Sequence, residues 1–140
     1  MIQRIQSLWL LIAGILSFAT FRLSYFSGNK LDAATNEKVF ISLNASQHIV
    51  LMILAVAIAV ASWVAIFLYK DRKRQLLVTG IILGVTLINI AFYHHQSGQF
   101  VEGKMDLTSI AIFSLPVFVG LAFRGIWKDE QLVKSADRLR

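Results

Sequence analysis

The residues of this chain whose types and spacing could support chemistry are its three histidines, His48, His94 and His95. Two imidazoles on facing helices are what bis-histidine haem ligation requires, and they can also supply half of a metal site. His48 opens one long apolar run and the other two close the next, so antiparallel helices would bring all three to one level. A polar aromatic side chain is equally ordinary where a membrane meets water. Because only Glu102 or Asp106 could complete a ligand set, we expect interfacial histidines and no bound cofactor or metal.

Other catalytic chemistry has no visible basis in the sequence. The 140 residues include no cysteine, which excludes disulfides, thiol catalysis and cysteine-ligated metal clusters. Neither the G-x-S-x-G nucleophile motif nor a glycine-rich phosphate loop is present. No acidic residue lies in the core of an apolar run, where transporters and proton relays usually carry carboxylates. The sequence therefore predicts a protein that is not an enzyme.

The elements that would position these residues are long apolar segments. Hydrophobic residues make up 56% of the chain and charged residues 16%, and the mean hydropathy is +0.65. The apolar residues fall into four runs of membrane-spanning length, at about 7–26, 46–69, 76–94 and 108–126. We expect an all-α membrane protein in which four transmembrane helices form one up-down bundle, a single domain over residues 1–140. Arg22 falls inside the first run, either snorkelling to the interface or serving a function there.

A short basic segment sets the expected orientation. Residues 70–75 lie between the second and third runs and carry Lys70, Arg72, Lys73 and Arg74. Four spans place both termini on the same side of the membrane as this segment, and that side then holds ten of the 14 basic residues. The positive-inside rule then places both termini and this loop in the cytoplasm. The net charge of +6 is therefore explained by the topology and by attraction to anionic lipid. Nucleic acid is not an expected partner.

The connecting segments on the other side are polar. Ser27 to Lys30 reads as a turn, and Lys38 to Leu43 has the composition of a short strand or hairpin. Residues 95–107 read as a second polar loop, with Gly98 and Gly103 as turn residues.

Four residues within the runs indicate how the helices pack. Gly80 and Gly84 form a G-x-x-x-G motif, for which contact with a neighbouring helix is favoured over homodimerisation. Asn89 lies deep in its run, so its amide should face the bundle interior and hydrogen-bond another helix. Pro116 removes a backbone donor in the middle of the fourth run, which predicts a shape-defining bend rather than a gating hinge.

The charged tail, residues 127–140, has the pattern of an amphipathic helix. Its apolar stripe consists of Leu132, Val133, Ala136 and Leu139. Such a short helix is marginal alone in water, so either a membrane surface or a partner protein should bury the stripe. Lys134 and Arg138 lie opposite the stripe and would point away from a membrane, which favours a protein partner.

The two ends of the chain resemble a known family. The opening Met1-Ile2-Gln3-Arg4-Ile5-Gln6 and the closing segment from Lys128 to Arg140 resemble a bacterial family of small four-helix membrane proteins, domain of unknown function 4293. The resemblance covers the whole chain. It implies an inner-membrane protein with both termini inside, and it implies no activity, substrate or catalytic residue.

Two functions follow as expectations. The first is a non-enzymatic accessory or assembly subunit of a larger membrane complex, which docks through its transmembrane faces and its tail in the lipid bilayer. The alternative is a small-molecule, quinone or haem-binding membrane protein, or a minor transporter.

Overall fold

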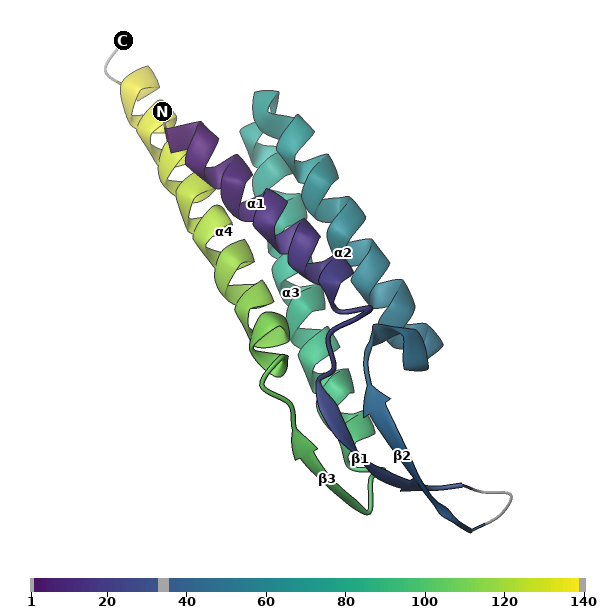
Figure 1. Ribbon diagram of the computed structural model, residues 1–140. Coiled ribbons are helices and arrows are strands. Elements are labelled where there is room, and N and C mark those ends of the chain that lie inside the picture. Colours follow the sequence, from purple (N-terminus) through teal and green to yellow (C-terminus); the bar gives the residue numbers. More distant parts are fainter. Residues whose placement is uncertain (1, 33–35, 139–140) are drawn as a thin grey trace.

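The computed structural model describes the backbone of residues 2–32 and 36–138 and the side chains of residues 5–32 and 36–135. This part of the chain forms four α-helices, three β-strands and two short 3₁₀ helices (Figure 1). The α-helices are α1 (Ile2–Ala19), α2 (Ile49–Phe67), α3 (Arg72–Ser97) and α4 (Ser109–Arg138). The strands are β1 (Phe26–Leu31), β2 (Lys38–Leu43) and β3 (Glu102–Met105), and the 3₁₀ helices are η1 (Ala45–Gln47) and η2 (Leu68–Lys70).

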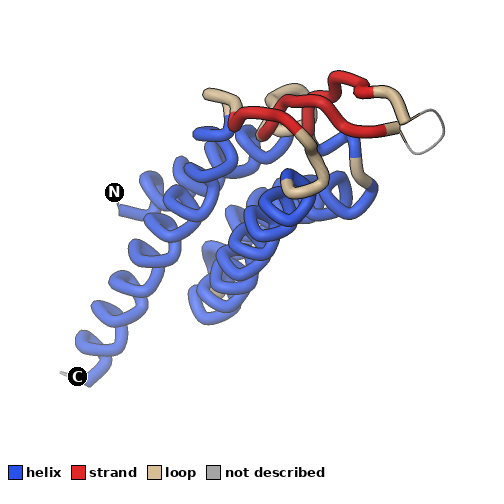
Figure 2. The backbone as a smooth tube through the Cα atoms, turned by 90° about the horizontal axis from the view of Figure 1, so that it is seen from below, coloured by secondary structure: helices blue, strands red, loops and turns tan. Residues whose placement is uncertain are grey.

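The helices form an up-down bundle. Each packs against the next along the chain, and α4 returns to pack against α1. The chain termini lie together at one end of the bundle, which we call the terminus end, and the strands lie at the opposite end, which we call the sheet end (Figures 1 and 2). The predicted bundle architecture is therefore present, but the fold is not all-α, because a small sheet is added to it.

Within the described part of the chain, three helical segments are long and apolar enough to cross a membrane: Ile49–Lys70, Arg72–Ser97 and Ser109–Ser135. They overlap the last three predicted runs. The apolar part of α1 is shorter, at Ile5–Ala19, so the expected first span of residues 7–26 is too long. The helix ends at Ala19, and the chain then turns into the sheet. Arg22 consequently lies beyond the helix and is exposed, rather than within a span.

The basic loop expected at residues 70–75 is almost entirely helical. Lys70 ends η2, and α3 begins at Arg72, so Asp71 alone separates the two helical elements. Its side chain accepts the backbone N–H of Arg74 at 3.2 Å, which is the usual way an aspartate caps a helix. The loop was expected because the segment is highly charged, but a charged segment can also begin a helix when a residue such as Asp71 caps it.

The sheet has the strand order β2-β1-β3, and both pairings are antiparallel. The predicted strand at Lys38–Leu43 is β2, but the turn predicted at residues 27–30 is wrong, since these residues lie within β1. Strand β3, which contains Gly103, was not anticipated. Gly28 pairs with Gly103, and a Cβ at Gly28 would lie 2.2 Å from the Glu102 carbonyl oxygen. These glycines therefore permit a close approach of two backbones, and they do not make turns.

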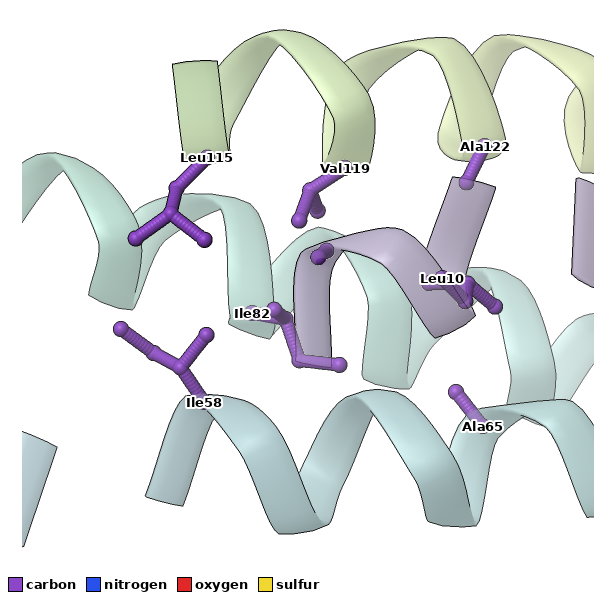
Figure 3. Packing of buried hydrophobic residues seen from close by; sticks show 8 residues of the cluster. Leu10, Ile58, Ala65, Ile82, Leu115, Val119 and Ala122 are labelled. Atoms are coloured by element: carbon purple, nitrogen blue, oxygen red, sulfur yellow. The ribbon is translucent and has the colours of Figure 1, made fainter. Parts of the chain in front are cut away.

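Buried side chains form two clusters. The larger lies within the four-helix bundle (Figure 3). It consists of Leu10, Ala13, Ile58, Ala65, Ile82, Leu115, Val119 and Ala122. The smaller lies at the sheet end and consists of Tyr25, Leu43, Leu51, Tyr93 and Ile112. The alanines at the larger cluster allow helices to approach closely, which is how helices associate in lipid.

Helix α4 is a single 30-residue helix. It runs through Pro116 and continues through the predicted tail to Arg138 without interruption. The expected boundary between the fourth span and the tail, at residues 126–127, is therefore not a break in the helix. Figure 1 shows α4 extending past the first turn of α1 at the terminus end.

Candidate docking surfaces and polar interior

The inward face of α3 is polar along most of its length. Its buried residues follow an alternating spacing of four and three: Gln75, Thr79, Ile82, Thr86, Asn89, Tyr93 and Gln96. Its exposed large side chains are apolar, among them Leu77, Ile81, Leu87 and Ile88. Such an arrangement suits a helix that faces lipid outside and protein inside. Of these polar residues, only Asn89 was predicted to face the interior. The spacing of the others along residues 75–96 also indicates one inward helix face.

Near the terminus end these polar groups have partners. Gln75 Nε2 donates to the Ala65 carbonyl on α2 at 3.0 Å. The hydroxyls of Thr79 and Thr86 donate to carbonyls of their own helix, at 2.8 and 2.7 Å. Here the polar face is satisfied by helix backbone.

Asn89 differs from these residues. It is 1% exposed, as expected for a residue facing the bundle interior, but neither its Oδ1 nor its Nδ2 has a hydrogen-bond partner among the described residues. The expected interhelical hydrogen bond is therefore not formed. A buried polar group without a partner costs about 1–3 kcal/mol, and where one occurs in a native protein an ordered water or a ligand is a usual explanation.

The surroundings of Asn89 toward the sheet end are polar and aromatic. Tyr93, one turn along α3, is fully buried, and its hydroxyl lies beside that of Thr20 without forming a hydrogen bond. The rings of Tyr93 and Tyr25 are 5.1 Å apart. On α1, Ser17 donates to the Ala55 carbonyl of α2 at 2.7 Å. This part of the bundle thus contains side chains that can donate and accept hydrogen bonds.

The histidines do not converge on one point. His48 caps α2, where its Nδ1 accepts the Val50 N–H at 3.2 Å. The rings of His48 and His95 both contact Phe92, at centroid distances of 5.1 and 6.4 Å, and His94 is exposed. Over the described residues no group of three His, Cys, Asp or Glu side chains could hold a metal ion.

The two glycines of the G-x-x-x-G motif have different surroundings. A Cβ at Gly80 would lie 3.3 Å from the ring of Phe123 on α4, so this glycine sits at a helix contact. Gly84 is exposed, and a Cβ there would meet nothing within 4 Å. The motif as a whole is therefore not used inside this bundle, and Gly84 remains open to an approaching helix.

The terminus end holds a buried polar pair that the sequence analysis missed. Gln6 Nε2 donates to Asp129 Oδ2 at 2.9 Å, which joins α1 to α4. Arg72 Nη1 donates to the Asp129 backbone carbonyl at 3.1 Å, which joins α3 to α4. Asp129 is only 8% exposed because it continues the inward-facing series of α4, three residues after the buried Ile126. Continuing that helical spacing into the charged tail would have identified it.

Beyond Asp129, α4 exposes the first half of the predicted apolar stripe. Leu132 is 60% exposed and Val133 is 43% exposed. The side chains of Ala136 and Leu139 lie outside the described residues. Glu130 and Lys134 form an ion pair of 2.9 Å on this part of the helix, at the i,i+4 spacing that places two side chains on one helix face.

The sheet presents a largely polar outer face with one large aromatic side chain. Phe40 is 71% exposed and lies level with Asn29 and Glu102 across the three strands. A 2.9 Å ion pair from Lys38 lowers the pKa of the Glu102 carboxyl by hydrogen bonding and by charge. Among the described strands, neither β2 nor β3 has a second neighbour, so both edges of the sheet are open.

Comparison with known proteins gives one match. The model of the family described as "Domain of unknown function (DUF4293)" matches residues 2–139. No curated protein and no solved structure matches the chain significantly.

Proposed function

The chain belongs to the DUF4293 family, and we propose that it is a non-enzymatic accessory or assembly subunit of a larger complex in the bacterial inner membrane. The observation that carries this proposal is the exposure of Leu132 and Val133 near the end of α4, a helix that is long and apolar enough to cross a membrane. Exposed apolar side chains on a helix can be buried in an apolar groove of a partner protein, which stabilises the complex.

Two further features support docking to protein. The Lys134 ammonium is neutralised by Glu130, so this part of the tail offers little attraction to an anionic membrane surface. Within the membrane, Gly84 leaves room for the close backbone approach that drives helix association in lipid. The protein would thus contact its partner at two levels, through a transmembrane face and through the tail.

The proposal is tested by purification from native membranes in a gentle detergent. The double substitution Leu132→Ser with Val133→Ser should reduce the co-purifying partner at least tenfold while the protein stays folded. Lys128→Ser, also at an exposed position of α4, is the matched control and should retain the partner. An equal yield of partner with the double variant would overturn tail docking and move the contact into the membrane.

We also propose that both termini and the segment 70–75 face the cytoplasm, because this segment and the two terminal segments of the sequence together contain ten of the 14 basic residues. Alkaline phosphatase fused after Arg140 should be inactive, and the same enzyme fused near Thr35, between β1 and β2, should be active. Activity of the fusion after Arg140 would contradict the proposed cytoplasmic location of the C-terminus.

A second candidate function is favoured by the unpartnered amide of Asn89. A small molecule with carbonyl or hydroxyl groups, such as a quinone, could accept a hydrogen bond from Nδ2 within this half of the bundle. The absorption spectrum of the purified protein and of its organic extract tests this idea. A bound compound should be lost with Asn89→Leu and retained with Ile88→Leu, which faces outward. A compound-free extract, or equal amounts from both variants, would reject this candidate.

A further inference from the structure

A groove lies at the terminus end, between the α2–α3 connection and the extension of α4. Its volume is about 640 Å³. It is lined by Lys70, Asp71, Arg72, Lys73, Glu130, Val133 and Lys134. We call it the basic groove. Its basic side chains come from η2 and the start of α3, which are adjacent in the sequence, and from α4, whose lining residues follow about sixty residues later.

The acidic residues of the basic groove do not neutralise it. Asp71 is paired with Arg74, which is not a lining residue, at 3.0 Å, and Glu130 is paired with Lys134 at 2.9 Å. Lys70 and Lys73 form no ion pair with a described acidic side chain, and neither does Arg72. The four basic and two acidic lining residues leave a net positive charge, most of it on the α2–α3 side.

One of these cations is held in a fixed direction. Arg72 donates through Nη1 to the Asp129 backbone carbonyl at 3.1 Å, an uncharged acceptor that leaves the guanidinium charge uncompensated. The remaining donors of a guanidinium form a planar fork that matches the oxygens of a phosphate. The arginine is therefore oriented by the protein before any anion binds.

The position of the basic groove selects the kind of anion. The apolar segment of α2 ends at Lys70 and that of α3 begins at Arg72, so the groove lies where the hydrocarbon layer gives way to headgroups. Tyr69 and Trp127, both about half exposed, lie beside it in the sequence and are typical of that interface. Basic pockets between helices at this depth are suited to anionic lipid headgroups.

We propose that the basic groove binds the phosphate headgroup of an anionic phospholipid, with the acyl chains remaining in the bilayer. The bound phosphate would lie against Lys70, Arg72 and Lys73 on the α2–α3 side of the groove, because the charge of Lys134 is already balanced by Glu130. This inference does not depend on the docking partner proposed above.

The full-length protein in a neutral detergent provides the test. Phosphatidylglycerol, phosphatidylcholine and sn-glycerol 3-phosphate are titrated separately, and binding is followed by native mass spectrometry and by the unfolding temperature. Phosphatidylglycerol alone should bind and raise the unfolding temperature. Equal binding of phosphatidylcholine would overturn an electrostatic site, and equal binding of glycerol phosphate would overturn lipid as the occupant.

Two double variants with the same loss of charge decide whether the groove is responsible. Lys70→Gln with Lys73→Gln removes two lining cations and leaves the Arg72 contact intact. It should weaken phosphatidylglycerol binding by roughly tenfold or more, since each basic residue near anionic lipid contributes about a fivefold factor. Arg124→Gln with Lys128→Gln removes two exposed basic residues of α4 that do not line the groove, and it should bind nearly as tightly as the wild type. Equal weakening in both variants would show that net charge alone attracts the lipid and would overturn the proposal.

Discussion

Two buried amides, Gln6 at the terminus end and Asn89 in the half nearer the sheet, differ in whether they have a hydrogen-bond partner. At the terminus end Gln6 and Asp129 are buried and bonded to each other at 2.9 Å, and Arg72 adds a second contact to Asp129. In the half nearer the sheet, Asn89 is equally buried but has no partner for either amide atom. That end is held instead by backbone pairing of three strands and by packed aromatic rings.

This difference separates two roles that burial alone does not distinguish. A buried amide with a partner joins two helices, because breaking the bond would leave polar groups in an apolar interior. A buried amide without a partner adds no such link and is instead available to a water molecule or a ligand. The pair at the terminus end is therefore a structural joint between α1 and α4, whereas Asn89 forms no such link.

The largest effect is expected where the sheet end depends on backbone approach. A Cβ at Gly28 would lie 2.2 Å from the Glu102 carbonyl oxygen and 2.5 Å from the Gly103 Cα, so Gly28→Ala must separate β1 from β3. We expect a loss of about 3 kcal/mol in unfolding free energy, the upper range for overpacking. Gly98→Ala, whose new Cβ would have only an ordinary contact at 3.4 Å, is the control. Denaturant unfolding in detergent measures both, and equal stability of the two variants would contradict the close approach.

At the terminus end, Asp129→Ala should cost about 2 kcal/mol, because it removes a charge-assisted hydrogen bond and leaves the Gln6 amide buried without a partner. The double variant Gln6→Leu with Asp129→Leu should recover much of this loss, since neither polar group then remains unpaired. The same unfolding measurement applies. A double variant as unstable as the sum of the single changes would show that the pair is not coupled.

Asn89→Leu is expected to act in the opposite direction. Because neither amide atom has a partner, replacing the side chain with an apolar one of similar size should leave the protein as stable or raise its stability by about 1 kcal/mol. Thermal unfolding in detergent is the measurement. A destabilised variant would indicate that Asn89 is bonded in the folded protein, to a ligand or to water, and would sharpen the contrast with Asp129.

The smallest effect concerns the exposed ion pair of the sheet. Lys38 lowers the pKa of Glu102 from 4.5, so the folded protein holds this carboxyl ionised to a lower pH than the unfolded chain does. The pair should therefore contribute stability above pH 4.5 that is lost as the pH falls through the lowered pKa of the folded state. The difference in unfolding temperature between wild type and Lys38→Gln should shrink on acidification. A difference independent of pH would rule out this linkage.

Much of the helical part of the fold was predictable from the sequence because apolar runs of spanning length are a local signal. The last three predicted runs overlap α2, α3 and α4, and the strand predicted at Lys38–Leu43 is β2. The limits of local reading appear at the element boundaries. Arg22 was placed in a span because the apolar composition continues past Ala19, where the helix in fact ends.

The remaining features depend on contacts between distant residues. Gly28 and Gly103 were predicted to be turn residues, but they lie opposite each other in two paired strands and are 75 residues apart in the sequence. Asp129 belongs to a charged tail in the sequence, yet it faces Gln6 across the bundle, 123 residues away. Asn89 could be assigned to the interior from its depth in an apolar run, but whether its amide finds a partner depends on which side chains three other helices place beside it. Composition and periodicity determine which segments are apolar enough to cross a membrane and which face turns inward, because these depend on each segment alone. Only the tertiary structure decides which buried polar groups are joined, because a hydrogen bond requires two particular atoms within about 3 Å.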